Sequence, residues 1–313
     1  MERSRLRTST GRLRAPWRLL VAIVCVLFAS VVGSIVFLSI DGLFLSLSEP
    51  LLTIGIGTAS GVAVAVGLVV AIRTLDRRRI RSFGLALDGA WWRDLGVGLA
   101  LGGGLIAVAV LVGTAIGAYR LRFAPSAPDG LTLLFGFSAV AVFVCVVGFY
   151  EELLFRGYVL TNTVEGLSAY ANGRWAALGA VGLSSLGFGV VHGLNPEMNL
   201  LGLGTITVAG VALGVGYVAT GRLGFPIGFH ITWNAAHFVF GLPVSGLDLG
   251  IRLFEAERVG SALVHGGAVG PEGGVLGFAV ALLGCFLTVG YVGLIGGGLR
   301  SEVATGPSID RSQ

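Results

Sequence analysis

The sequence predicts an all-α membrane protein, a polytopic bundle of about eight transmembrane helices. Of the 313 residues, 54% are hydrophobic and only 12% are charged, and the mean hydropathy is +0.88. A soluble domain of this length carries a much larger charged surface, so the composition excludes a water-soluble enzyme. The apolar residues also form long runs of about 18 or more, the length that an α-helix needs to cross a bilayer.

Eight apolar runs follow one another along the chain, and each is expected to form one membrane helix. They cover residues 17–40, 51–74, 95–118, 131–160, 175–193, 199–220, 225–241 and 274–298. The first run is too long for the core of a signal peptide, and no clear cleavage site of small residues follows it. We therefore expect this first helix to remain as a membrane anchor.

The distribution of arginine predicts the orientation in the membrane. Arginines precede the first run and fill the connection between the second and third runs: Arg3, Arg5, Arg7, Arg12, Arg14, Arg18, Arg73, Arg77, Arg78, Arg79 and Arg81. Because positive residues are retained on the cytoplasmic side, both segments are expected there. An even number of spans then returns the C-terminus, with Arg300 and Arg311, to the cytoplasm.

The composition divides the chain into four segments. They are a basic N-terminal segment at 1–16, two helices and a basic loop at 17–81, a helical core at 82–298 and a polar tail at 299–313. Trp91 and Trp92, beside charged residues, indicate an interfacial segment at 82–94 that leads into the third span. The longest external connection, 242–272, has no ligand pattern and is expected to be a solvated loop.

Three ionisable residues stand inside the run 131–160, where lipid should surround the helix. They are Glu151, Glu152 and Arg156. A charge near the bilayer centre costs about 2.5 to 3.5 kcal/mol, which indicates a functional site. Glu152 and Arg156 are one turn apart and can form an ion pair, whereas Glu151 is turned about 100° away. We assign Glu152 with Arg156 to structure and Glu151 to chemistry.

Two further pairs of residues with helical spacing bring polar groups into apolar runs. Phe188 and His192 are one turn apart near the end of the fifth run, and His230 and Asn234 are one turn apart in the seventh. A single histidine in an apolar helix is more often a packing residue than a catalytic one, so neither pair is decisive alone. His237 falls on nearly the same stripe as His230 and is expected to be structural.

A helical hairpin that turns at residues 171–173 would bring Glu151 level with His192. At about 1.5 Å per residue, that turn lies about 30 Å from both side chains. Either the hairpin projects beyond the bilayer or the segment 157–170 bends, and the sequence leaves both possibilities open.

The familiar signatures of several enzyme classes are absent. The chain has no H-E-x-x-H zinc helix, no G-x-S-x-G serine motif and no G-x-G-D aspartate motif. It also has no phosphate-binding loop, and its three cysteines lack the C-x-x-C spacing of a thiolate zinc site or redox pair. Glutamate, histidine and asparagine therefore remain as the candidate catalytic groups.

Together the polar residues form three ordered motifs, each within an expected membrane helix. These are Glu151-Glu152-x-x-x-Arg156, Phe188-x-x-x-His192 and His230-x-x-x-Asn234. In this order they resemble the CPBP family, the CAAX protease and bacteriocin-processing family, also called Abi, which includes the type II CAAX prenyl endopeptidases. The resemblance covers roughly residues 82–241.

The resemblance implies an intramembrane endopeptidase that cleaves a membrane-associated peptide or protein, possibly of CAAX or bacteriocin type. Glu151 would act as general base on a water that His192 positions, and His230 and Asn234 would stabilise the oxyanion. Phe188 would pack in the site. The reaction would need either no cofactor or a divalent metal such as zinc, held by Glu151, His192 and His230; we prefer the metal-free mechanism.

Other functions remain as alternatives to the protease. One is a non-catalytic immunity or scaffold protein that binds a peptide in the same cavity. Another is a proton-coupled transporter, although the chain lacks the repeated halves that such carriers commonly show. We expect an integral protein of a prokaryotic plasma membrane. Its expected partners are the lipid bilayer and a membrane-associated peptide or protein substrate, without nucleic acid.

Overall fold

The computed structural model describes residues 6–8, 11–128 and 130–298 of the chain. The predicted polar tail, 299–313, lies outside the described residues, as do Arg3 and Arg5. The long helices are α1 (Ala15–Ile40), α2 (Glu49–Thr74), α3 (Gly89–Ala115), α4 (Leu133–Glu152), α6 (Gly173–His192), α7 (Leu200–Thr220), α8 (Gly224–Val239) and α10 (Val275–Leu294). The shorter elements are α5 (Thr161–Leu167), α9 (Ala262–His265), the π-helical segments η1 (Asp41–Leu45) and η3 (Leu153–Leu160), and the 3₁₀ turns η2 (Ile80–Phe83), η4 (Gly267–Val269) and η5 (Pro271–Gly273).

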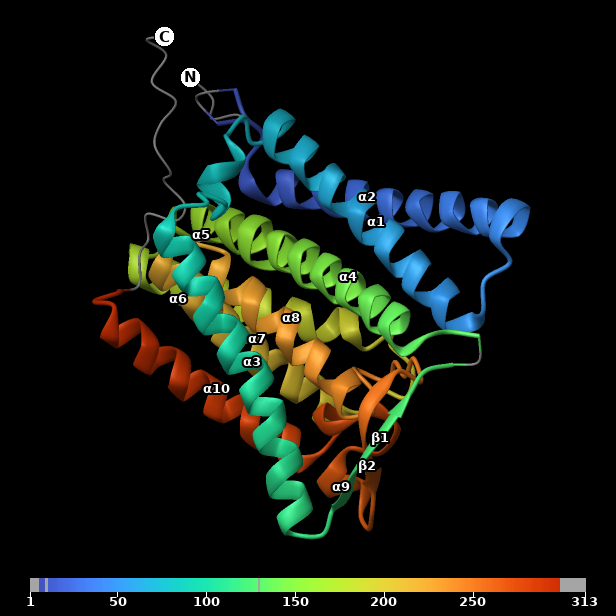
Figure 1. The fold of residues 1–313 in the computed structure, drawn as a ribbon. Helices are drawn as coiled ribbons and strands as arrows, with labels where there is room; N and C mark the ends of the chain where they lie inside the picture. The colour runs from blue at the N-terminus through green and yellow to red at the C-terminus, as the bar shows by residue number, and fades with distance from the viewer. Residues whose placement is uncertain (1–5, 9–10, 129, 299–313) are drawn as a thin grey trace.

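The prediction of an all-α polytopic membrane protein is confirmed (Figure 1). Among the described residues, seven helices are long and apolar enough to cross a membrane. The difference from the expected eight lies in α8, which forms where the seventh span was expected but has only 16 residues. At 1.5 Å per residue it is about 24 Å long, less than the hydrocarbon core of about 30 Å.

Helix α4 continues without a break through η3 into α5, so the helical run extends from Leu133 to Leu167. The segment that follows Gly157 therefore stays helical as far as Leu167, and the chain turns only before α6. Asn172 caps the start of α6, where its side chain accepts a hydrogen bond from Trp175 N. A run of 35 residues measures about 52 Å, so it must tilt or extend beyond the hydrocarbon core.

Helices α3 and α8 pack with their backbones in direct contact. A Cβ atom added to Gly98 would lie 2.2 Å from the Phe225 carbonyl oxygen, and one added to Gly102 would lie 2.1 Å from that of Phe229. On the other helix, a Cβ added to Gly228 would lie 2.3 Å from the Leu95 carbonyl oxygen. Only glycine fits at these crossings, which fix the position of the helix that carries His230 and Asn234.

The structure contains a small sheet that the sequence did not predict. Strand β1 (Tyr119–Ser126) pairs in antiparallel fashion with β2 (Arg252–Arg258), and Phe123 lies opposite Phe254. The expectation that 242–272 is a solvated loop is therefore wrong, since the connection contains β2, α9, η4 and η5. The alternation of apolar Tyr119, Leu121 and Phe123 with arginines was the available signal for a strand.

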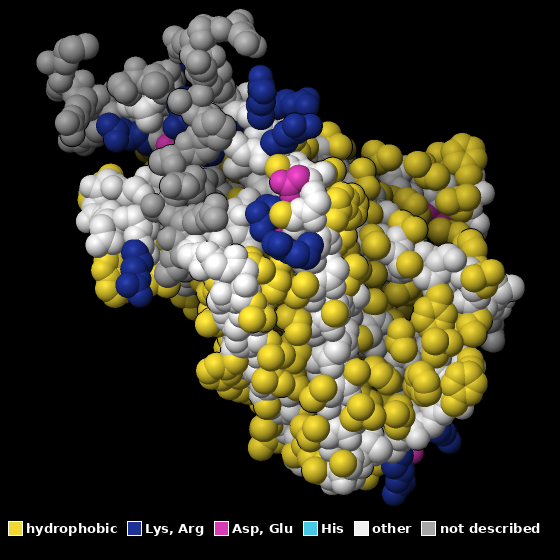
Figure 2. Space-filling view, turned by 60° about the vertical axis from the view of Figure 1, so that its left-hand side comes forward, with side chains coloured by type: hydrophobic (Ala, Val, Ile, Leu, Met, Phe, Trp, Pro, Cys, Tyr) yellow, Lys and Arg dark blue, Asp and Glu magenta, His cyan; other side chains and the backbone are white. Residues whose placement is uncertain are grey.

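Because successive helices run in opposite directions, the connections gather at two ends of the molecule (Figure 1). The arginine-rich end consists of the start of α1 and the connections 75–88, 168–172 and 221–223. The sheet end consists of the connections 41–48, 116–128, 193–199 and 240–274. Figure 2 shows arginine side chains mainly at one end, with a broad apolar surface beneath them and a few more at the opposite end.

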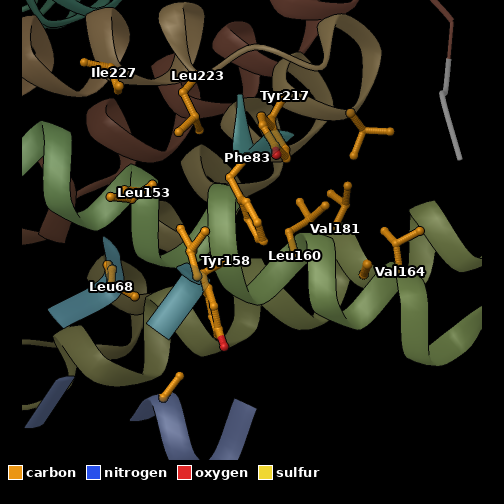
Figure 3. Close-up of a cluster of buried hydrophobic side chains, with 14 of the residues drawn as sticks. Leu68, Phe83, Leu153, Tyr158, Leu160, Val164, Val181, Tyr217, Leu223 and Ile227 are labelled. Atoms are coloured by element: carbon orange, nitrogen blue, oxygen red, sulfur yellow. The ribbon is translucent and has the colours of Figure 1, made fainter. Parts of the chain in front are cut away.

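A large apolar cluster fills the interior next to the arginine-rich end (Figure 3). It joins residues of nine helical elements and of the connection 221–223, among them Leu68, Phe83, Leu153, Tyr158 and Leu223. All five side chains are fully buried. The cluster lies beyond the Glu152 end of α4, so it separates the polar residues of the motifs from the arginine-rich end.

The N-terminal helix is attached to this body through buried charges. Arg18 Nη1 lies 2.8 Å from Asp76 Oδ1, and Arg18 Nη2 lies 2.7 Å from Glu165 Oε1. Burial raises the pKa of Asp76, and the charge of Arg18 opposes that rise. The contacts tie α1 to the end of α2 and to α5.

Candidate active site

Glu151 and Glu152 occupy the last two positions of α4, where the helix changes to the wider π-helical segment η3. π-Helical segments within α-helices are frequently found at functional sites. Arg156 lies inside η3, and its Nη1 is 2.7 Å from Glu152 Oε1. Both side chains of this pair are fully buried.

The guanidinium of Arg156 also contacts the two neighbouring helices. Its Nη2 donates to the Gly210 carbonyl of α7 at 3.3 Å, and its Cζ lies 4.3 Å from the ring centroid of Phe188 on α6. A cation over an aromatic face is attracted by the ring quadrupole. Arg156 therefore joins three helices around the buried carboxylate.

Glu152 has a second partner that sequence analysis did not identify. His230 Nδ1 on α8 lies 2.8 Å from the same Oε1 atom that Arg156 contacts. When Glu152 is ionised its oxygen can only accept, so Nδ1 carries the proton of this hydrogen bond. Glu152 thus fixes the orientation of the His230 ring in addition to neutralising Arg156.

The carboxylate of Glu151 faces two imidazoles through one oxygen. Its Oε2 lies 3.8 Å from His192 Nε2 and 3.8 Å from His230 Nε2. Its Oε1 accepts a hydrogen bond from the Tyr150 hydroxyl at 3.0 Å, whereas no described residue hydrogen-bonds Oε2. Distances of 3.8 Å exceed a direct hydrogen bond and suit a bridging water.

His192 is held by the last turn of its own helix. Its Nδ1 lies 2.7 Å from the Phe188 carbonyl oxygen, which can only accept, so Nδ1 is the donor. In the neutral ring, Nε2 then carries a lone pair. The Phe188 ring meets the His192 ring edge-on at 4.6 Å and the His230 ring at 5.8 Å between centroids. Phe188 therefore packs between both histidines and Arg156.

The candidate catalytic residues line one cavity of about 230 Å³. Glu151, His192, His230 and Asn234 all line it, together with apolar residues of α2, α4, α7 and α8. His230 and Asn234 are largely buried, at 7% and 8% exposure. The three motifs thus converge from three separate helices on a single space.

The comparison with protein families gives a match over the same segment. Residues 132–236 match the family described as Rce1-like, type II CAAX prenyl endopeptidase Rce1-like. The motif-bearing segment is therefore similar to this family. The match covers about a third of the chain and contains all seven motif residues, so it confirms the resemblance to the CPBP family. Comparisons with curated proteins and with solved structures gave no match.

Sequence analysis missed a buried carboxylate on the wall of the cavity. Glu272 in η5 is only 4% exposed, and both its oxygens accept hydrogen bonds. Oε1 is 2.8 Å from Trp233 Nε1, and Oε2 is 2.7 Å from both the backbone nitrogen and the hydroxyl of Ser245. The available signal was a glutamate directly before an apolar run, in a segment that was assigned to solvent.

The remaining histidine of α8 lies outside the cavity. His237 is fully buried, and its Nδ1 donates to the Trp233 carbonyl at 2.7 Å. It does not line the cavity that contains His230. Its position is that of a packing residue on the helix that supplies His230 and Asn234 to the cavity.

Glu151, His192 and His230 are the residues that could hold a divalent metal such as zinc. Within the part of the chain that the structure describes, no group of three histidine, cysteine, aspartate or glutamate side chains is placed to hold a metal ion. The Nδ1 atoms of His192 and His230 are hydrogen-bonded to other groups, so only their Nε2 atoms face Glu151. The described arrangement of Glu151, His192 and His230 therefore does not fit a three-ligand metal site.

Proposed function

We propose that the protein is an intramembrane endopeptidase that hydrolyses a peptide bond of a membrane-associated peptide or protein. The Rce1-like segment suggests a protease of the CAAX type. The observation that carries the proposal is the position of Glu151 Oε2, which faces the Nε2 atoms of His192 and His230 at 3.8 Å each. A carboxylate beside two imidazoles in an enclosed cavity is suited to activating a water.

In the proposed reaction Glu151 is the general base. A water beside Oε2 donates one proton to the carboxylate and attacks the carbonyl carbon of the substrate. His192 Nε2, with its lone pair, accepts a hydrogen bond from the same water and orients it. The C–N bond then breaks, and the proton held by Glu151 passes to the leaving amine.

The negative oxygen of the intermediate needs hydrogen-bond donors. Asn234 supplies an amide N–H, and His230 supplies Nε2–H when its ring is protonated on both nitrogens. The carboxylates of Glu151 and Glu152 flank that ring at 3.8 and 2.8 Å and so stabilise its positive charge. Loss of one such donor typically costs about 2.7 to 4 kcal/mol of transition-state stabilisation.

The proposal is tested by comparing the membrane-bound peptides of cells that carry the wild type or the Glu151→Gln variant. We expect a set of cleavage products that disappears in Glu151→Gln, because the amide cannot accept the proton of water. Mass spectrometry of the membrane fraction identifies these products and with them the substrate. CAAX-type and bacteriocin-like peptides are the first candidates to examine.

The matched control is Glu257→Gln, which removes a carboxylate from the exposed strand β2. It should leave the product set unchanged. Identical products from wild type and a well-expressed Glu151→Gln variant would contradict the protease and favour a non-catalytic immunity or scaffold protein. Solute uptake into proteoliposomes that depends on Glu151 would instead support the transporter.

Chelation gives a separate expectation, because the proposed mechanism uses only side chains of the chain. Activity of the purified protein should persist after prolonged treatment with a zinc chelator, and metal analysis should show less than one zinc per chain. Inactivation by the chelator, with recovery on addition of zinc, would contradict the metal-free mechanism while leaving the protease intact.

A further inference from the structure

The cavity reaches connecting segments of the chain only at one end. Five of its lining residues lie outside the long helices: Asn195, Val244, Ser245, Leu247 and Glu272. All five belong to the connections 193–199 and 240–274 of the sheet end. The described connections of the arginine-rich end contribute no residue to the lining.

The opposite end of the cavity is closed by packed side chains. Beyond Glu151 toward the arginine-rich end lie the ion pair of Glu152 and Arg156 and then Leu153 and Tyr217, all fully buried. The apolar cluster shown in Figure 3 continues this barrier. At the sheet end, by contrast, the lining residues Asn195 and Leu247 are half-buried, so packed side chains do not fully cover the cavity wall there.

The charges at the two ends differ strongly. The connection 75–88 alone carries Arg77, Arg78, Arg79 and Arg81. The described arginines of the sheet end lie in β1 and β2, where Arg122 pairs with Glu255 at 2.7 Å. Short connections rich in arginine are retained in the cytoplasm during insertion. The arginine-rich end is therefore the cytoplasmic end, and the mouth of the cavity lies on the other side.

We propose that the active-site cavity opens toward the outer face of the membrane and that the substrate is an outward-facing segment of an exported, membrane-attached polypeptide. The orientation of the cavity is inferred from the arginines at one end and from the packed side chains that close the cavity toward that end. The identity of the substrate rests also on the proposed protease function. A lipid-modified tail in the cytoplasmic leaflet would approach the closed end.

The rim of the mouth supports a substrate held at the membrane surface. Leu194 and Leu200 lie at the two ends of the connection that contains Asn195, and they are 91% and 87% exposed. Large apolar side chains this exposed, beside a polar cavity, are typical of a surface that contacts lipid or an apolar partner. A peptide attached to the outer leaflet would pass over these leucines before it reached Glu151.

The orientation is tested by cysteine labelling in intact cells. In a background with Cys25, Cys145 and Cys285 replaced by alanine, single cysteines are introduced by Leu194→Cys at the sheet end and Leu87→Cys at the arginine-rich end. Both leucines are exposed, at 91% and 59%. A membrane-impermeant maleimide should label Leu194→Cys in intact cells and Leu87→Cys only after permeabilisation. The reverse pattern would overturn the proposal.

Access to the cavity itself is tested with Leu247→Cys and Asn195→Cys, which line it at the sheet end. We expect at least one of the two to be labelled in intact cells. If Leu194→Cys is labelled and neither cavity cysteine is labelled even after permeabilisation, the mouth is not at this end and the proposal fails. Two positions are used so that misfolding of one variant does not remove the test.

The substrate part is decided by the location of the cleavage sites that depend on Glu151. Sites in outward-facing segments of exported proteins support it, and sites in cytoplasmic segments overturn it. If no site depends on Glu151, the proposed protease function fails while the labelling result still decides the orientation. The two failures are therefore distinguishable.

Discussion

Glu151→Gln in the purified protein is expected to lower kcat/KM by roughly 10²- to 10⁴-fold, the range typical of a lost general base. The amide is nearly the same size as the carboxylate but cannot take a proton from water. His192→Ala should also reduce activity, because His192 Nε2 and Glu151 Oε2 face the same water position. When two residues act as a unit, the activity losses caused by replacing each of them do not add. The double variant should therefore be only slightly slower than Glu151→Gln.

The measurement is a kinetic comparison of the three variants on the substrate identified in cells, with Glu257→Gln as control. Thermal unfolding in detergent should show that all of them remain folded. Multiplicative activity losses in the double variant would indicate that the two side chains act independently. Full activity in Glu151→Gln would contradict the proposal that this carboxylate is the general base.

Arg156→Met is expected to lower the free energy of unfolding by about 3 to 5 kcal/mol, because removal of one partner leaves a buried charge uncompensated. The uncompensated group is Glu152, whose side chain is fully buried. Arg122→Met is the matched control, since it breaks an arginine–glutamate pair at the same 2.7 Å distance on the exposed sheet. Exposed pairs contribute about 0 to 1 kcal/mol. Denaturant unfolding in detergent measures both.

The double variant Arg156→Met with Glu152→Leu separates stability from activity. It removes both charges, and replacing a whole buried pair by apolar residues is often neutral or stabilising. Stability should therefore recover, whereas activity should stay low because His230 has lost the carboxylate that orients its ring. Recovery of both stability and activity would show that Glu152 serves only to neutralise Arg156. Equal stability losses in Arg156→Met and Arg122→Met would contradict the expectation that breaking the buried pair costs more than breaking the exposed one.

The helices were predictable because membrane insertion imposes a simple length and composition rule. Each of the eight expected spans coincides with a helix, and the bounds of α2 and α7 differ from the prediction by at most two residues. The rule says nothing about structure outside the hydrocarbon core. It therefore missed the pairing of β1 with β2, which depends on contacts between residues more than a hundred positions apart.

The motif residues were predictable because ionisable side chains are costly in an apolar helix and so are conspicuous there. Glu151, His192 and His230 meet through helix crossings that sequence alone does not give, such as the glycine contacts of α3 with α8. The shared contact of Glu152 with Arg156 and His230 was missed because helical spacing reveals partners only on the same helix. Glu272 was missed because its burial depends on the fold of the connection 240–274.

The shortness of α8 has a consequence for the supply of the second reactant, water. Irregular backbone at membrane depth is tolerated where protein covers it or where it borders a hydrated space. The connection after α8 begins before a full bilayer thickness has been crossed, and its Ser245 and Glu272 border the cavity. The proposed hydrolysis would consume one water molecule per turnover, and this segment would shorten the hydration route to Glu151 by replacing part of the lipid barrier with hydrogen-bonding groups.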